Sequence, residues 1–142
     1  MEKEKKILQA EKEITIRFSE VDSLKIVWHG SYLLYLEDAR EWFGKQYHLE
    51  YMYMFENGFL APLVDVRMQY KSVLRYGDRA RVVIRYRNSC AAKLVFDYEI
   101  YNVTTGALAL TASTTQVFMT RDYELILSMP EFIEQWKKNN GL

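Results

Sequence analysis

Two side chains that can transfer protons, Asp22 and His29, lie in one predicted loop over residues 20–30. A carboxylate can act as a general base or as a nucleophile, and a histidine exchanges protons near neutral pH. An aspartate between two structural elements, however, commonly caps a turn through its side chain. Residue type alone therefore favours the turn cap for Asp22 and leaves catalysis as the alternative.

Other catalytic patterns are missing from the sequence. Two histidines and a single cysteine, Cys90, give no metal-ligand spacing, so we expect neither a metal nor a cofactor. No nucleophile-elbow pattern supports Ser-His-Asp catalysis, and no glycine-rich phosphate loop is present. Catalysis would have to use the carboxylates, the histidines and the backbone of the chain itself.

The residues on either side of the loop predict the elements that hold it. Ile14, Ile16 and Phe18 alternate with polar residues, which is typical of a strand that ends where the loop begins. After the loop, apolar residues recur every three or four positions over residues 31–47 and predict one long helix. Ser31 is its expected N-cap, since a serine hydroxyl can accept a bond from a free amide.

From residue 64 to about residue 120 the apolar residues occur at every second position, which predicts four strands. Three short turns separate them, at residues 76–78, 88–89 and 105–106. Such short connections favour antiparallel neighbours. Ser128 and Pro130 then predict the start of a C-terminal helix over residues 130–138.

Length and composition fit one α+β domain over residues 1–142. With 49% hydrophobic and 15% aromatic residues, the chain can build a core without disulfides. One strand, one long helix and four further strands correspond to a single sheet packed on a helix. The segment 1–11 is rich in lysine and glutamate, and we expect it to be frayed.

Charge and hydropathy limit the partners and the compartment. The formal net charge is zero, so no global basic field attracts nucleic acid or an anionic membrane. No apolar run approaches the roughly 18 residues of a membrane span. The N-terminus lacks the apolar region of a signal peptide, and one cysteine suits a reducing compartment. We therefore expect a cytoplasmic protein with no nucleic-acid partner and no membrane span.

Several motifs follow one another in a fixed order along residues 12–130. They are residues 17–22, 26–32, 37–40, 58–64, 70–78 and 106–119. The first is an aromatic strand end leading to Asp22, and the third is the helical sequence Glu37-Asp38-Ala39-Arg40. Together they resemble the 4-hydroxybenzoyl-CoA thioesterase family. The resemblance implies a hot-dog fold, in which a curved antiparallel sheet of about five strands wraps a long helix.

The resemblance also implies an activity: acyl-CoA thioester hydrolysis to a free acid and CoA. Asp22 matches the catalytic aspartate, as nucleophile or as general base. The backbone amide of His29 matches the donor that stabilises the developing oxyanion. The His29 side chain either touches substrate or is a plain residue at the start of the helix.

Four further residues are expected to bind substrate. Tyr32 is expected to be a core or pocket-wall residue, and Val64 to contact the substrate. Lys71 and Lys93 could bind coenzyme phosphates through charge-assisted hydrogen bonds. The alternative for both lysines is a solvated charge at the edge of the sheet.

Two other carboxylates lie near the matched aspartate. Glu20 is interpreted as a solvated loop charge, and Glu37 as the i,i+3 ion-pair partner of Arg40. Leu24 and Lys25 stand where relatives carry small residues, often glycine. Without a flexible glycine, either the loop follows another path or Lys25 alters the electrostatic field around Asp22.

The resemblance implies a homodimer, often paired into a homotetramer, with two active sites at the dimer interface. Two alternatives to the acyl-CoA thioesterase stay open. One is an acyl-[acyl carrier protein] thioesterase, and the other is a non-catalytic hot-dog module that binds acyl-CoA. The presence of Asp22 argues against the binding module.

Overall fold

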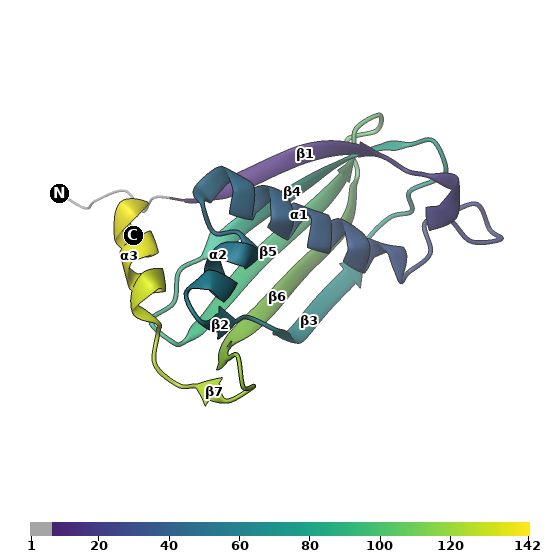
Figure 1. Ribbon diagram of the computed structural model, residues 1–142. Helices are drawn as coiled ribbons and strands as arrows, with labels where there is room; N and C mark the ends of the chain where they lie inside the picture. The colour runs from purple at the N-terminus through teal and green to yellow at the C-terminus, as the bar shows by residue number, and fades with distance from the viewer. Residues whose placement is uncertain (1–6) are drawn as a thin grey trace.

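The computed structural model describes residues 7–142, and within them one curved sheet packs on one long helix (Figure 1). The elements are β1 (Gln9–Thr15), the 3-10 helix η1 (Phe18–Glu20), α1 (Ser31–Tyr47), α2 (Tyr51–Glu56), β2 (Phe59–Leu60), β3 (Leu63–Tyr70), β4 (Arg79–Arg87), β5 (Lys93–Asn102), β6 (Leu108–Thr120), β7 (Leu125–Ile126) and α3 (Glu131–Asn139). The α+β hot-dog architecture, the long helix and the C-terminal helix are confirmed.

The sheet is antiparallel throughout its long strands, in the order β1-β4-β5-β6-β3. The four long strands after α1 are those that the period-two pattern predicts. The first strand is predicted only in part, because β1 ends at Thr15 and Phe18 lies in η1 instead of continuing the strand. The two-residue strands β2 and β7 pair with the far end of β6 and were not predicted. A strand of two residues is too short to show a sequence period, so these strands can be recognised only from their pairing in the fold.

The N-terminal prediction needs a correction. Residues 9–11 are not frayed, because they pair with β4 as the first half of β1. Leu8 and Ala10 are buried in the core, whereas Glu11 and Lys12 face solvent. The dense charges of residues 11–13 therefore lie where both faces of an edge strand are exposed. Residues 1–6, the rest of the segment expected to fray, lie outside the described part of the chain.

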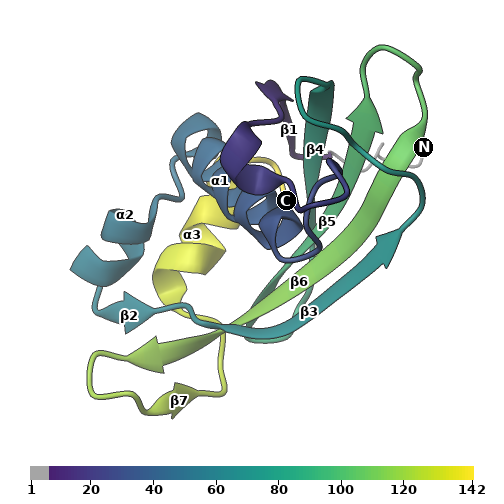
Figure 2. The same ribbon diagram turned by 90° about the vertical axis from the view of Figure 1, so that its right-hand side faces the viewer.

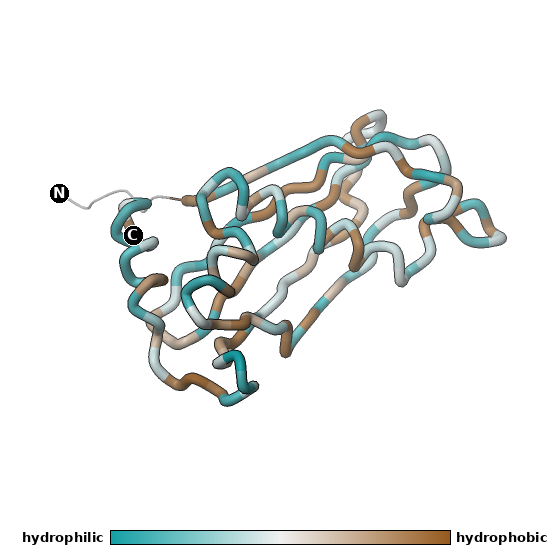
Figure 3. The backbone as a smooth tube through the Cα atoms, viewed as in Figure 1, coloured by the Kyte–Doolittle hydropathy of each residue, from teal (hydrophilic) through white to brown (hydrophobic). Residues whose placement is uncertain are grey.

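Figure 2 shows the sheet curving around α1, and the core fills the space between them. Hydrophobic and hydrophilic residues alternate along the strands in Figure 3, so each strand presents one apolar face to the helix. The residues that α1 buries against this face include Tyr32, Tyr35, Leu36, Ala39 and Phe43. This packing fixes the start of α1 beside the end of β3, where the loop over residues 20–30 also lies.

The helix α3 closes the other end of the sheet. Ile133 and Trp136 are buried, and the Trp136 indole donates to the carbonyl of Tyr47 at the end of α1, at 2.7 Å. None of the helices over residues 7–142 is both long enough and apolar enough to span a bilayer.

Candidate active site

Asp22 lies in a small hairpin between β1 and α1. Val21 and Val27 form an antiparallel bridge, and the Asp22 N–H donates to the carbonyl of Ile26 at 2.9 Å. The carboxylate oxygen Oδ1 accepts the N–H of Leu24 at 2.8 Å, which is an Asx turn. The second oxygen, Oδ2, accepts no hydrogen bond from the described residues. Asp22 is therefore a turn cap, and it also keeps one carboxylate oxygen available to a substrate or a water molecule.

Lys25 takes the most restricted position in this hairpin. Its φ of 64° is left-handed, and its N–H donates to the Asp22 carbonyl at 3.0 Å. The Lys25 carbonyl in turn accepts the N–H of Tyr76 at 3.4 Å. A lysine thus occupies a conformation that glycine adopts most easily. The replacement of small residues by Leu24 and Lys25 is compatible with a tight, hydrogen-bonded loop.

The start of α1 leaves backbone donors available beside the hairpin. The Trp28 N–H donates to the carbonyl of Glu20 at 3.0 Å, and the Ser31 N–H donates to the carbonyl of Trp28 at 2.9 Å. Between them, the amides of His29 and Gly30 donate to no backbone or side-chain acceptor in residues 7–142. The helix dipole adds partial positive charge at this point. The His29 amide can therefore stabilise a negative charge on a bound oxygen.

His29 is held in place by its neighbours. Its carbonyl accepts the hydroxyl of Tyr70 at 3.2 Å, and its exposed ring lies 4.8 Å from the ring of Trp28. The Trp28 ring packs over Gly30 so closely that a Cβ at Gly30 would lie 2.1 Å from it. Gly30 therefore allows the Trp28 ring to pack against the backbone next to the free amides.

The structure corrects two expectations at this junction. Gly30, rather than Ser31, is the N-cap of α1, and the Ser31 hydroxyl donates to the Glu20 carbonyl at 2.9 Å. Glu20 is buried rather than solvated, because its carboxylate accepts the N–H of Arg17 at 2.7 Å and the Arg17 Nε–H at 3.2 Å. Burial, followed by the charge of Glu20, raises the pKa of the nearby Tyr35 phenol. Glu20 thus joins the end of β1 to the start of α1.

Tyr32 is a core residue. Its ring packs edge-to-face on Tyr35 at 6.0 Å and on Tyr70 at 5.4 Å between centroids. Burial, and then the neighbouring Tyr70, raises the pKa of the Tyr32 phenol. Tyr32 therefore forms a wall behind the loop and stays neutral near pH 7.

The remaining predicted binding residues lie at two ends of the sheet. Lys71 is exposed directly after β3, at the Asp22 end. Val64 is exposed on β3, and Lys93 is half-buried at the start of β5, both at the opposite end. Along β6, the partners of Tyr70 and Lys93 are seven residues apart, or roughly 23 Å. A single chain therefore brings Lys71 near the loop and keeps Val64 and Lys93 away from it.

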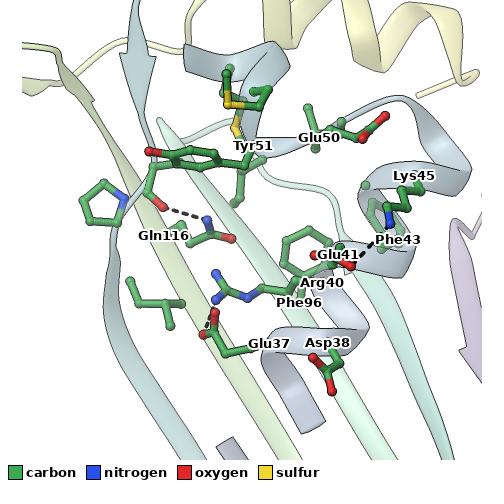
Figure 4. A pocket seen from close by; sticks show the side chains of 18 residues that line it. Glu37, Asp38, Arg40, Glu41, Phe43, Lys45, Glu50, Tyr51, Phe96 and Gln116 are labelled. Atoms are coloured by element: carbon green, nitrogen blue, oxygen red, sulfur yellow. Dashed lines mark hydrogen bonds and ion pairs between the residues drawn. The ribbon is translucent and has the colours of Figure 1, made fainter. Parts of the chain in front are cut away.

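A cavity of about 710 Å³ lies between α1, α2 and the sheet, and we call it the α1–α2 cavity (Figure 4). Its apolar wall includes Phe43, Leu49, Met54, Leu94 and Phe96. Arg40 and Gln116 are polar side chains that point into it. The lining residues include neither Asp22 nor His29.

The expected ion pair between Glu37 and Arg40 is confirmed, and it lies in this cavity. The Arg40 side chain is mostly buried, and its Nε has no hydrogen-bond partner among the described residues. Four acidic and two basic side chains line the cavity. Burial, and then the charge of Glu41, raises the pKa of the Asp38 carboxyl. The cavity is thus apolar in its walls and slightly acidic in its charge.

Sequence reasoning missed the α1–α2 cavity as a site. Its walls come from residues 37–63, 94–96 and 116, which only the fold brings together. One local signal was present, since Gln116 occupies a core-facing position of β6 between Thr114 and Phe118. A buried amide in an apolar strand face needs a polar partner, and so indicates a polar site.

No group of three or more His, Cys, Asp or Glu side chains within residues 7–142 is placed to hold a metal ion. Cys90 is exposed in the turn between β4 and β5. The loop site offers the Asp22 carboxylate, the exposed His29 ring and the backbone amides at the start of α1.

A long helix wrapped by a curved antiparallel sheet, with an aspartate loop before the helix, defines a hot-dog protein. Two solved thioesterase structures share this fold. A 1,4-dihydroxy-2-naphthoyl-CoA thioesterase from Synechocystis superposes with a TM-score of 0.80 at 21% identity, over 90% of this chain and 94% of that one. The corresponding enzyme of Staphylococcus aureus gives a TM-score of 0.79 at 26% identity, over 94% and 95% of the two chains.

Sequence comparison identifies the family. The model of the thioesterase-like superfamily matches residues 16–137. YneP of Bacillus subtilis (strain 168), provisionally named an acyl-CoA thioesterase, is 33% identical over 113 residues, covering 80% of this chain and 81% of YneP. A 1,4-dihydroxy-2-naphthoyl-CoA hydrolase of Thermosynechococcus vestitus is 22% identical over 126 residues, or 88% of this chain and 86% of that protein. The chain belongs to the thioesterase-like superfamily, as its motifs predict.

Proposed function

We propose that this chain hydrolyses an acyl-CoA thioester to a free acid and CoA, with Asp22 and the His29 amide as its catalytic groups. The observation that carries the proposal is the hairpin over residues 20–28. This hairpin holds the Asp22 carboxylate, with one oxygen free, in the same short loop as the free His29 N–H. A base or nucleophile and an oxyanion donor are the two groups that thioester hydrolysis requires. The relatives named for CoA thioesters support CoA as the leaving group.

The reaction follows from the two groups. The His29 N–H donates to the thioester carbonyl oxygen and stabilises the charge that develops on it. As a general base, Asp22 removes a proton from water while the water oxygen bonds to the carbonyl carbon. As a nucleophile, Asp22 forms an anhydride that water then hydrolyses. In both routes the carbon–sulfur bond breaks, and the CoA thiolate leaves and takes up a proton.

A homodimer through β3 would complete the site. β3 pairs with β6 along one edge, and no described strand pairs with its other edge, where Val64 and Val66 are exposed. Exposed strand edges commonly pair with another chain. Antiparallel pairing of two β3 strands would put Leu63 of one copy, beside the α1–α2 cavity, near Tyr70 and Asp22 of the other. Two copies would thus bring the Asp22 loop of one chain near Val64 and Lys93 of the other. Within one chain these two regions lie roughly 23 Å apart.

The test is thiol release from a panel of aliphatic and aromatic acyl-CoA thioesters, with matched thioesters of an acyl carrier protein beside them. We expect faster release from CoA thioesters. A preference for carrier-protein thioesters would make this chain a carrier-protein thioesterase. Acyl-CoA binding without release of thiol would make it a binding module and reject the proposal.

A further inference from the structure

The two free amides of the loop site, those of His29 and Gly30, lie in a short segment that is attached at both ends to one carbonyl oxygen. Before them, the Trp28 N–H donates to the Glu20 carbonyl at 3.0 Å. After them, the Ser31 hydroxyl donates to the same carbonyl at 2.9 Å. The place of the free amides therefore depends on both of these bonds.

The Glu20 carbonyl is itself held in place. The Glu20 N–H donates to the Arg17 carbonyl at 3.0 Å, and the Glu20 carboxylate accepts the Arg17 N–H at 2.7 Å. Glu20 and Ser31 are only 8% and 5% exposed, so water has little access to replace a lost bond. A hydrogen bond in such surroundings is stronger than one in water.

Glu20 also lies at the base of the hairpin that carries the catalytic carboxylate. Asp22 follows it by two residues, and the Asp22 N–H donates to the Ile26 carbonyl at 2.9 Å. The segment that carries Asp22 and the segment that carries the His29 N–H therefore meet at one residue. Among the described side chains, the Ser31 hydroxyl alone donates to the Glu20 carbonyl.

The Ser31 hydroxyl does not have the usual role of a serine at the start of a helix. Such a serine normally accepts a bond from a free amide of the first turn. Here Gly30 is the N-cap, no side chain caps the helix, and the Ser31 hydroxyl donates away from α1 to the Glu20 carbonyl. Its hydrogen bond thus connects the helix start to the hairpin.

We infer that Ser31 is a positioning residue, whose bond to the Glu20 carbonyl keeps the His29 N–H at a fixed place relative to Asp22. The inference rests on the proposed thioesterase function, in which this N–H stabilises the oxyanion. Ser31 acts through the backbone and not by contact with the thioester. Since a misplacement of roughly 1 Å can cost about 10²-fold in rate, a small shift of the amide has a measurable effect.

Ser31→Thr and Ser31→Val isolate the hydroxyl, because threonine and valine have nearly the same shape and only threonine can donate. The kcat of Ser31→Val should be at least about fivefold below that of Ser31→Thr, with little change in KM, since the N–H acts mainly in the transition state. A smaller difference in kcat, or a change mainly in KM, overturns the inference while the thioesterase proposal stands. If the larger side chains prevent folding at this buried position, Ser31→Ala and the wild type are compared by the same criterion.

Ser72→Ala is the matched control for a lost hydroxyl. The Ser72 hydroxyl also donates to a backbone carbonyl, that of Leu108, at 2.8 Å. Chemical denaturation gives the folded fraction of each variant, and kcat is expressed per folded protein. Ser72→Ala should be less stable than the wild type but should keep its kcat. An equal loss of kcat in Ser72→Ala and Ser31→Ala would show a general effect of destabilisation and would overturn the inference.

The ¹⁵N relaxation of the His29 and Gly30 amides tests the positioning without any substrate. A rigid backbone amide has an order parameter of about 0.85, and a flexible one lies below about 0.6. Both amides should be rigid in the wild type and in Ser31→Thr, and more mobile in Ser31→Val. This result supports the inference even if no thioester is hydrolysed and the thioesterase proposal fails. In that case, equal order parameters in the two variants, or flexible amides in the wild type, overturn it.

Discussion

Asp22→Asn separates the two roles that the structure gives to one side chain. The Asp22 carboxylate holds the N–H of Leu24 at 2.8 Å and keeps its second oxygen available. An asparagine oxygen can accept the same N–H, so the hairpin and the free energy of unfolding should change little. The amide is neither a base nor a nucleophile. We therefore expect kcat to fall by at least ~10², the usual scale for an acid–base group, or about 2.7 kcal/mol of transition-state stabilisation.

The assay measures thiol release over a range of acyl-CoA concentrations, together with chemical denaturation of each variant. KM should change little, because the carboxylate acts mainly in the transition state. Asp22→Ala should lose activity as well and, in addition, about 1 kcal/mol of unfolding free energy with the lost hydrogen bond. Asp122→Asn, at an exposed aspartate in the β6–β7 turn, is the control and should remain active. The catalytic assignment is refuted if Asp22→Asn retains near wild-type kcat while Asp22→Ala is only less stable.

Four further predictions follow from other parts of the chain. Ser31→Ala removes the bond to the Glu20 carbonyl and should lower the free energy of unfolding by about 1 kcal/mol, as measured by denaturation; an unchanged value contradicts this. Lys93→Ala should raise KM for CoA thioesters with little change in kcat, and should not affect an N-acetylcysteamine thioester that lacks the nucleotide. Light scattering at micromolar concentration should give at least twice the chain mass of 16.9 kDa, and a stable, active monomer would rule out the dimer. Arg85, more than any other neighbour, lowers the pKa of the Glu99 carboxyl, so its stabilisation is present above the ordinary value of 4.5 and is lost as the pH falls through the lowered pKa. Glu99→Gln should therefore lose less stability than the wild type as the pH is lowered below 4.5 in acid denaturation, and identical curves would contradict the pairing.

The large elements could be predicted because burial imposes a period on the sequence. α1 has the predicted bounds, since one apolar stripe faces the sheet along its whole length. The long strands follow from the alternation of core and solvent faces. The short strands β2 and β7 could not be predicted in this way, because they depend on pairing with the far end of β6.

The loop site could be predicted only in part. Asp22 and His29 are matched by motif, but their geometry depends on contacts between segments that the chain order does not reveal. Glu20 was expected to be a solvated loop charge, whereas the fold places it against Arg17 and the start of α1. The core-facing position of Gln116 in β6 could suggest a polar site, but the cavity around it could not be predicted, because its walls come from distant segments.

The left-handed conformation of Lys25 has an energetic consequence for this loop. A non-glycine residue in that conformation costs roughly 1–2 kcal/mol in the folded state. Glycine would avoid this cost but would lose about 0.5–1 kcal/mol more through its greater freedom in the unfolded chain. The two effects partly cancel, so the net advantage of glycine over lysine here is at most about 1.5 kcal/mol. A glycine at this position is therefore a poor criterion for recognising the loop in a sequence, whereas the hydrogen bonds that join residue 22 to residues 24, 25 and 26 are its defining feature.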